Sequence, residues 1–316
     1  MKALELSLII PCYNNASTLE IFFSVLNKIN CKSFEVILVN DGSTDNTEKV
    51  LKNLSQIQPF GVKVIKQKNM GPGTARNNGL KQAEGKYVWF IDSDDFFNPE
   101  ALPYMLKILS DSKADILTFD YKIIQNENQI QYSNSNDYVL ENSRHAILFE
   151  PSCPWSKIYR RSFLVNNKIV FPPYYFAEDL VFNIRAWVKA DKIIHLNQVV
   201  YNYFQRTDSI SNTWVDKHIS EFIEVVKLLK KESEINKSYR EEICYIICRH
   251  IESFLSNVSY QDHEKEVDEI NSFVSDSKIN ENTYESIRNE LINKYEGSFR
   301  WKITEPLSKV KKMFKK

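Results

Sequence analysis

Short apolar runs that end in polar residues recur along the first hundred residues, and this pattern most restricts the possible folds. The runs cover residues 6–10, 34–39, 62–65 and 87–91. Helical patterns over about residues 17–29, 45–57 and 73–84 separate them. Alternation of this kind predicts an α/β fold, in which a mostly parallel sheet carries helices on both faces.

Polar residues follow each of the four runs. In parallel sheets, ligands bind beyond the carboxyl ends of the strands, so these residues are expected along one edge, called the carboxyl edge below. The residues concerned are Asn14, Asp41, Lys68 and Asp92. Four polar clusters on one edge predict a binding site there.

The fourth run ends directly in an acidic segment, Asp92-Ser93-Asp94-Asp95. Carboxylates crowded at a strand end repel one another unless a cation joins them. A hard divalent ion held by few carboxylates keeps coordination positions open for phosphate oxygens. The segment therefore predicts a metal–diphosphate site with Mn²⁺ or Mg²⁺. The alternative is a solvated acidic turn, since isolated D-x-D triplets are common.

The glycine-containing segment 71–76 distinguishes between nucleotide folds. It lies far from the first strand, and Arg76 stands where a dinucleotide fingerprint has its third glycine. No Walker lysine motif occurs in the sequence. A nicotinamide or P-loop enzyme is therefore disfavoured, and a turn that brings an arginine to a nucleotide diphosphate is expected.

Three segments together resemble glycosyltransferase family 2: residues 7–14, 39–45 and 92–95. Glu178 and Asp179, in front of an apolar helix, resemble the acidic catalytic motif of that family. The resemblance covers about residues 5–210 and implies a GT-A fold, that is, a Rossmann-like, mostly parallel sheet flanked by helices. Segments 153–161 and 201–211 resemble bacterial members that build capsule, exopolysaccharide or teichoic-acid glycans.

The resemblance implies an inverting transfer of a sugar from a UDP-sugar to a hydroxyl of a cell-surface glycan or its lipid-linked precursor. Asp94, with Asp92, would hold the metal, Asp179 would act as general base, and Glu178 would orient it or the acceptor. Trp155 would form the acceptor platform. Donor contacts are expected from Pro11, Tyr13, Asn14, Asp41, Lys68, Arg76, Asp92, Ser93, Arg206 and Ser211.

Several of these residues have a structural alternative. Acidic residues are favoured in any first helical turn, which applies to the pair at 178–179. Trp155 and Tyr13 are equally ordinary as core residues, and Asp41 also fits a helix-entry turn. Asp95 is expected to cap the turn that follows it.

Composition narrows the class of protein further. Lys and Arg total 41, as do Asp and Glu, so there is no net field to attract nucleic acid. No apolar stretch approaches 18 residues, so no membrane-spanning segment is expected, and no signal peptide is expected before the first strand. Five scattered cysteines suit a reducing compartment. A cytoplasmic protein is expected.

Strand and turn patterns give way to helical patterns near residue 215. This change predicts a catalytic domain over 1–214 and a helical module over 215–316. Within the catalytic domain, a nucleotide-sugar half is expected over about 1–98 and an acceptor half over about 99–214. Helices are expected from residue 216, with one apolar face, and over 241–258, 264–276 and 282–296. The face comprises Ile219, Phe222, Ile223, Val226 and Leu229.

The last ten residues combine five lysines with four apolar side chains. A basic amphipathic segment can lie on an anionic membrane surface, so a peripheral contact at the inner face of the membrane is one expectation, and a solvated end is the other. Contact with a second copy of the chain, or with the acceptor, is also left open.

Two rival functions remain at this stage. A non-catalytic GT-A module would bind a nucleotide-sugar or glycan without turnover and use its helices for assembly. A nucleotidyltransferase would also need an acidic edge, but normally has a glycine-rich basic loop after the first strand. Residues 11–14 lack that character.

Overall fold

The computed structural model describes residues 4–30, 33–124, 139–141, 152–204, 218–255 and 263–276. These residues form two compact units that divide between residues 212 and 213. The predicted helix at 282–296 and the basic tail lie outside the described residues.

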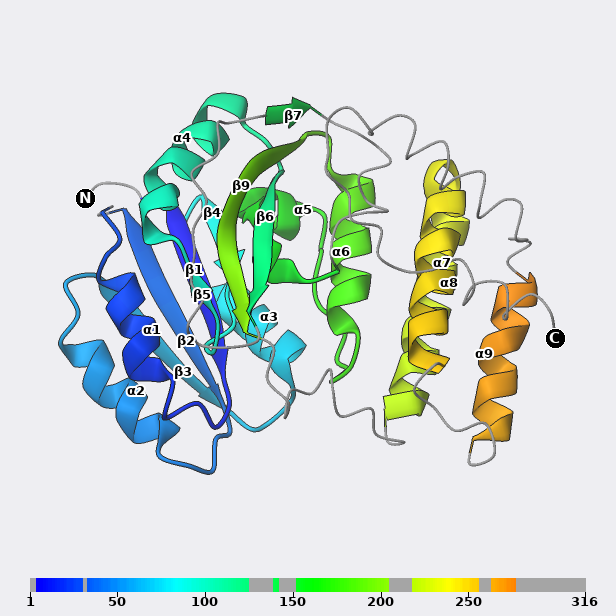
Figure 1. Cartoon of the computed structure of the whole chain (residues 1–316), viewed down its shortest axis with the longest axis horizontal. Helices are drawn as coiled ribbons and strands as arrows, with labels where there is room; N and C mark the ends of the chain where they lie inside the picture. Colours follow the sequence, from blue (N-terminus) through cyan, green and yellow to red (C-terminus); the bar gives the residue numbers. More distant parts are fainter. Residues whose placement is uncertain are drawn as a thin grey trace. The chain divides into compact units, whose positions relative to one another are not determined.

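The first unit opens with the predicted alternation of strands and helices (Figure 1). Its elements are β1 (Leu6–Cys12), α1 (Leu19–Leu26), β2 (Phe34–Asp41), α2 (Thr47–Gln56), β3 (Gly61–Gln67), α3 (Pro72–Gln82) and β4 (Tyr87–Phe90). All four predicted strands and all three predicted helices are confirmed. The helices are shorter than expected, because end residues are the least determined by local pattern.

The rest of this unit is more irregular. It comprises β5 (Phe96–Phe97), η1 (Pro99–Ala101), α4 (Leu102–Ser112), β6 (Ile116–Ile124), β7 (Val139–Glu141), η3 (Pro154–Ser156), β8 (Lys157–Arg160), α5 (Arg161–Asn166), α6 (Glu178–Lys189) and β9 (Ile193–Phe204). The described strands form one sheet in the order β3-β2-β1-β4-β8-β6-β9-β5, with β7 beside β9. The first four strands pair in parallel, whereas β8 pairs antiparallel with both of its neighbours. The α/β fold is therefore confirmed, with a mixed rather than mostly parallel sheet.

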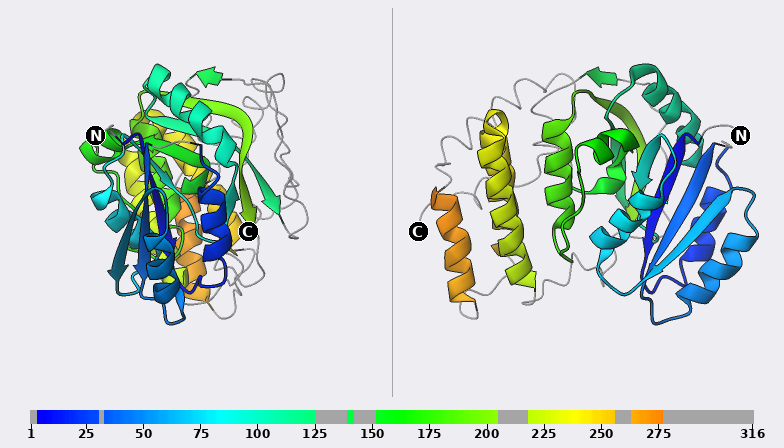
Figure 2. Two further views of the ribbon diagram at one scale, coloured as in Figure 1. Left: turned by 90° about the vertical axis from the view of Figure 1, so that its left-hand side faces the viewer. Right: turned by 180° about the vertical axis from the view of Figure 1, so that it is seen from behind.

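The two faces of the sheet carry different helices (Figures 1 and 2). Leu8 and Val36 point into the core that holds the apolar side of α1. Ile9, the next residue along β1, meets Gly79 of α3 so closely that an added Cβ would lie 2.3 Å from its Cγ2. Phe90, the partner of Ile9 on β4, packs edge-on against Phe182 of α6. Helices α3 and α6 therefore share one face, and their N-termini can meet.

The second unit consists of α7 (Ile219–Ile235), η5 (Lys237–Tyr239), α8 (Arg240–Leu255) and α9 (Glu264–Asp276). The predicted apolar face of α7 is buried throughout. Phe222 stacks on Phe254 of α8, with ring centroids 4.1 Å apart. Within the described ranges, no helix has the length and apolar character needed to cross a membrane.

Candidate active site

The strand register places the predicted polar residues along one edge. Cys12 pairs with Asn40, and Asp41 pairs with Gln67, so β1, β2 and β3 end at the same edge. Strand β4 runs parallel to β1 and is followed there by Asp92. The predicted clustering at the carboxyl edge is therefore present.

The loop after β1 is fastened to the loop after β2. Asn14 adopts a left-handed conformation with φ of 53°, which asparagine tolerates better than most residues. Its Oδ1 accepts the N–H of Thr44 at 2.8 Å, and its own N–H donates to Ser43 Oγ at 3.1 Å. Beside it, the Tyr13 side chain is 46% exposed and Pro11 is half-buried. Asn14 thus holds the two loops together, and the Tyr13 ring beside it is partly exposed.

Asp41 lies under the loop between β3 and α3. It is 4% exposed and accepts hydrogen bonds from Gln67 Nε2 at 2.8 Å and from the N–H groups of Met70 at 2.8 Å and Gly71 at 2.9 Å. All three partners are donors, so Asp41 serves as an acceptor. Lys68, in the same loop, is exposed.

Helix α3 begins where the backbone turns sharply. Gly71 has φ of +86°, which favours glycine, and Pro72 follows at the first helical position. A Cβ on Gly73 would lie 2.7 Å from Cγ of Glu178, so only glycine lets α6 approach this closely. The start of α3 is therefore built to meet the start of α6.

Arg76 bridges the two halves of the site. Its side chain is buried, donates to Asp92 Oδ1 at 2.7 Å and to Glu178 Oε1 at 2.9 Å, and lies 5.4 Å from the centre of the Phe171 ring. Burial would lower the pKa of Arg76, but the two carboxylates outweigh it and raise that pKa. The structure thus places Arg76, one of the predicted donor contacts, between acidic residues that come from the end of β4 and the start of α6.

The acidic segment after β4 points its members in different directions. Asp92 and Asp94 are half-buried, whereas Ser93 is buried with its hydroxyl against the Cys12 thiol. Asp95 is buried and accepts from the Tyr201 hydroxyl and from the Phe204 N–H, both at 2.8 Å. Two of the four residues, Asp92 and Asp94, are thus partly exposed to solvent, whereas Ser93 and Asp95 are not.

The prediction that Asp95 caps the following turn is wrong. Asn98 performs that role, since its Oδ1 accepts the N–H of Glu100 at 3.0 Å. Asp95 instead ties the acidic segment to β9, because both of its oxygens bond to residues of that strand.

The acidic pair at the start of α6 sits on strained backbone. Ala177, just before the helix, has φ of 56°, a left-handed conformation that costs a non-glycine residue about 1–2 kcal/mol. Such strain clusters at functional sites. Asn183 holds the first turn by donating to the Asp179 carbonyl at 2.9 Å, and its own Oδ1 accepts from the Tyr159 hydroxyl at 2.8 Å.

Burial and like charge raise the pKa of three carboxyl groups here. For Asp95, burial is the larger cause, and Asp92 and Asp94 add to it. Burial also raises the pKa of Glu178, with Asp179 adding to it while Arg76 opposes it. Burial raises the pKa of Asp179 to about 6, against the opposing charges of Arg76 and the buried Lys157. An acid of this strength can take and return protons near neutral pH.

Trp155 does not lie at the surface. Its side chain is 6% exposed and stacks on Tyr201 with centroids 4.5 Å apart and on Tyr203 with centroids 5.5 Å apart. The Trp89 Nε1 donates to its carbonyl at 2.7 Å. A ring covered in this way offers no face to a sugar, so Trp155 is a core residue and not an acceptor platform. Arg206 and Ser211 lie outside the described residues.

The described residues contain no group of three or more His, Cys, Asp or Glu side chains arranged to hold a metal ion. Asp92 and Asp94 are the two predicted metal ligands, and one oxygen of Asp92 accepts a hydrogen bond from Arg76. A cation of the Mg²⁺ type takes one or two carboxylates and fills its other positions with phosphate oxygens and water. The two residues therefore fit a metal that binds together with a diphosphate.

Three residues of this region were not singled out from the sequence. Gln67 and Tyr201 support Asp41 and Asp95, and buried Lys157 lies beside the Cys153 carbonyl at 3.1 Å. Gln67 follows a predicted strand, and that position is the one signal that could have found it. The contacts of the other two depend on strands that come together from distant parts of the chain.

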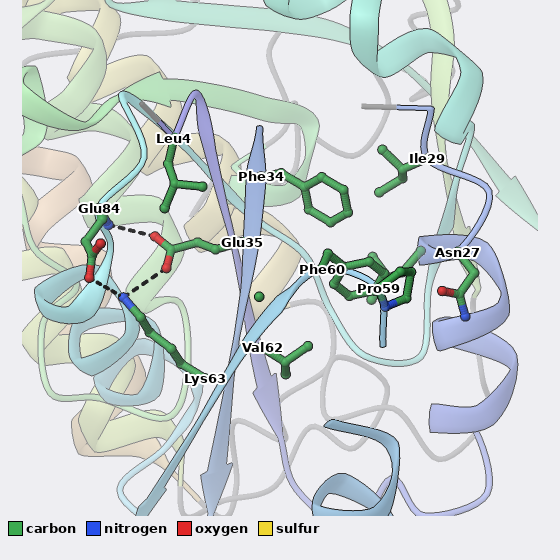
Figure 3. A pocket seen from close by; sticks show the side chains of 12 residues that line it. Leu4, Asn27, Ile29, Phe34, Glu35, Pro59, Phe60, Val62, Lys63 and Glu84 are labelled. Carbon is green, nitrogen blue, oxygen red and sulfur yellow. Dashed lines mark hydrogen bonds and ion pairs between the residues drawn. The ribbon is translucent and has the colours of Figure 1, made fainter. Parts of the chain in front are cut away.

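A pocket of about 670 Å³ lies at the opposite, amino edge of the sheet (Figure 3). On one side of the strands it is lined by charged residues, and on the other by apolar ones such as Phe34 and Phe60. Glu35, Lys63 and Glu84 are joined to one another by hydrogen bonds and ion pairs. None of the predicted site residues lines this pocket.

Comparison with known proteins agrees with the geometry of the carboxyl edge. The model of the family "Glycosyl transferase family 2" matches residues 7–168. The poly(ribitol-phosphate) beta-N-acetylglucosaminyltransferase TarS of Staphylococcus aureus is 29% identical over 76% of this chain and 43% of its own length. The putative glycosyltransferase EpsH of Bacillus subtilis is 27% identical over 79% of this chain and 76% of its own. The chain thus spans less than half the length of TarS.

A solved structure gives the same picture of the fold. The crystal structure of S. aureus TarS 1–349 in complex with UDP-GlcNAc superposes with a TM-score of 0.71, covers 92% of each chain and is 22% identical. This likeness shows a GT-A fold, as the sequence implied. Because the family model matches more than half of the residues, the chain belongs to glycosyl transferase family 2.

Proposed function

We propose that the protein is an inverting, metal-dependent glycosyltransferase that moves a sugar from a UDP-sugar to a hydroxyl of a cell-surface glycan or its lipid-linked precursor. One observation carries this proposal most directly. Arg76 joins Asp92, at the predicted donor side, to Glu178, which precedes the predicted base Asp179. Donor and acceptor chemistry would therefore share one rigid charge network.

The donor would lie over the carboxyl edge. Tyr13 has an exposed ring for stacking, and Asp41 offers an acceptor for the uracil N3–H. Asp94, with the Asp92 oxygen that does not bond to Arg76, would hold Mn²⁺ or Mg²⁺ beside the diphosphate. When bound, that ion supplies positive charge against the negative charge that grows on the leaving diphosphate.

The acceptor hydroxyl would be activated at the start of α6. Asp179 takes the hydroxyl proton while the oxygen attacks the anomeric carbon on the face opposite the diphosphate. The bond from that carbon to the diphosphate oxygen breaks, UDP leaves with the electron pair, and the anomeric configuration inverts. Arg76 holds Glu178 in place next to the base, which keeps the first turn of α6 ordered.

The relatives support the substrate class. TarS is named for transfer of N-acetylglucosamine to poly(ribitol-phosphate), and its solved structure holds UDP-GlcNAc. UDP-GlcNAc is therefore the first donor to test. Cell-wall and exopolysaccharide glycans are the first acceptors.

The test is release of UDP from a panel of UDP-sugars with Mn²⁺ or Mg²⁺, with and without EDTA. We expect one donor to be hydrolysed slowly without acceptor and EDTA to stop the reaction. Turnover that survives EDTA would contradict the metal requirement. UDP binding with no turnover of any donor, with or without glycan acceptors, would favour a non-catalytic binding module.

A further inference from the structure

A chain of side-chain hydrogen bonds leads from the surface of α3 to Asp41. Lys81 Nζ donates to Asn78 Oδ1 at 3.1 Å. Asn78 Nδ2 donates to Gln67 Oε1 at 2.7 Å, and Gln67 Nε2 donates to Asp41 Oδ1 at 2.8 Å. The chain, called the amide relay below, connects α3, the end of β3 and the end of β2.

The two ends of the amide relay fix its direction. An ammonium group only donates hydrogen bonds, and an ionised carboxylate only accepts them. If the Gln67 amide rotated by 180°, its oxygen would face the Asp41 carboxylate. If the Asn78 amide rotated by 180°, its NH₂ group would face the Lys81 ammonium group. Each reversal would break two hydrogen bonds, so Asn78 and Gln67 present their donors toward Asp41.

The relay leaves Asp41 one acceptor position for a ligand. Its Oδ1 accepts from Gln67 and from the Met70 N–H, which uses both lone pairs. Its Oδ2 accepts only from the Gly71 N–H among the hydrogen bonds found in the described residues. A group that bonds to the remaining position must be a donor.

We infer that Gln67 and Asn78 are positioning residues for base selectivity, because they hold Asp41 as a fixed acceptor. This inference rests on the proposed function. Uracil carries an N3–H that can donate to Asp41, whereas cytosine has a lone pair at N3 and would face the carboxylate with it. The relay would therefore favour uridine over cytidine nucleotides without touching the base.

The test compares binding of UDP and CDP by calorimetry, with the full chain and the same divalent ion. The quantity of interest is the ratio of the CDP Kd to the UDP Kd, because general destabilisation weakens both ligands together. Wild type should favour UDP. A hydrogen bond to a charged group corresponds to roughly tenfold or more in affinity, and that sets the expected size of the ratio.

Asn78→Asp removes the donor to Gln67 and adds an acceptor, which should turn the Gln67 amide and set its oxygen against Asp41. Gln67→Met removes the donor to Asp41 without adding charge. Both variants should lose most of the preference for UDP, by about tenfold. Lys81→Met removes only the exposed end of the relay and should change the ratio less than about twofold.

Asn77→Asp is the matched control on the same helix. Asn77 bonds to the backbone of Phe171, at 2.8 Å and 3.0 Å, and takes no part in the relay. This variant should lower thermal stability and leave the ratio unchanged. A rescue variant, Gln67→Lys combined with Asn78→Asp, supplies a donor between two carboxylates and should restore part of the preference.

Three outcomes would contradict the proposals, at different levels. A wild-type ratio in both Asn78→Asp and Gln67→Met would overturn the amide relay and leave the proposed function standing. Wild-type protein that binds UDP and CDP equally would also overturn the relay. Wild-type protein that binds neither nucleotide would overturn the proposed function itself.

Discussion

Both edges of the sheet contain buried carboxylates, but the pKa values of these groups shift in opposite directions. At the amino edge, Glu35 accepts from Ser7 Oγ and the Glu84 N–H, both at 2.7 Å, and pairs with Lys63 at 2.9 Å. Burial alone would raise the pKa of Glu35, but these bonds outweigh it and lower the pKa. At the carboxyl edge, the pKa values of Asp95, Glu178 and Asp179 are all raised.

The difference lies in the hydrogen-bond donors and charged groups that surround each carboxylate. Glu35 has a donor for each oxygen and a cation beside it, so its charge is satisfied within the fold. At the carboxyl edge, burial opposes the ionisation of Asp95, Glu178 and Asp179, and the neighbouring acidic residues add to this effect. Carboxylates with raised pKa in such a cluster are poised to bind cations and move protons. Burial by itself does not distinguish a structural acid from a functional one, whereas the balance of its neighbours does.

The largest effect is expected from Asp94→Ala. This change removes the predicted metal ligand at the carboxyl edge, so transfer should be abolished and UDP binding in Mn²⁺ or Mg²⁺ should weaken. The loss of transfer is measured as UDP release at saturating donor and metal, and the loss of UDP affinity is measured by calorimetry. Unchanged turnover would remove the metal site from this edge.

Asp179→Asn should separate catalysis from binding. The amide is nearly isosteric, so the fold and the affinity for UDP should survive. Transfer should fall by roughly 10²–10⁴, as for the loss of a general base. A loss of UDP affinity as large as the loss of rate would place Asp179 in the donor site instead.

The pH dependence of the wild type should report the same base. Asp179 must be ionised to accept a proton, and its pKa is raised to about 6. The rate at low acceptor concentration should therefore rise with pH up to about 6 and level off above it. An acid limb near the ordinary aspartate value, about pH 4, would show that the burial of Asp179 has no kinetic consequence.

The smallest effect on activity, and the clearest one on stability, is expected from Glu35→Gln at the amino edge. Since the pKa of Glu35 is lowered in the folded state, its stabilising effect is present above its unfolded pKa and is lost as pH falls through the folded value. The variant should lose about 1–3 kcal/mol of unfolding free energy at pH 7 and keep its activity within about twofold.

Denaturant titration at several pH values checks this, and the difference from wild type should shrink below about pH 4. Glu84→Gln is the matched control, because that side chain is exposed and its ion pair with Lys63 should contribute less than about 1 kcal/mol. Equal losses in the two variants, or a loss of transfer in Glu35→Gln, would end the contrast between the edges.

Local patterns in the sequence determined the first half of the sheet and the place of the site. The apolar runs at 6–10, 34–39 and 87–91 became the buried strands β1, β2 and β4, because burial on both faces needs continuous apolar strands. The run at 62–65 became β3, a more exposed strand at the end of the strand order. Their polar ends met at one edge because parallel strands end together. The spacing of apolar residues along the chain likewise predicted the buried face of α7.

Only the tertiary structure decided which of the site residues touch. Arg76 and Glu178 are 102 residues apart, and Asp95 and Tyr201 are 106 apart, so no local pattern could pair them. The antiparallel β8 and the burial of Trp155 depend on the same long-range packing. Residue types and their order fix which chemistry is available. Partners, burial and pKa depend on distances between remote segments, which exist only once the chain has folded.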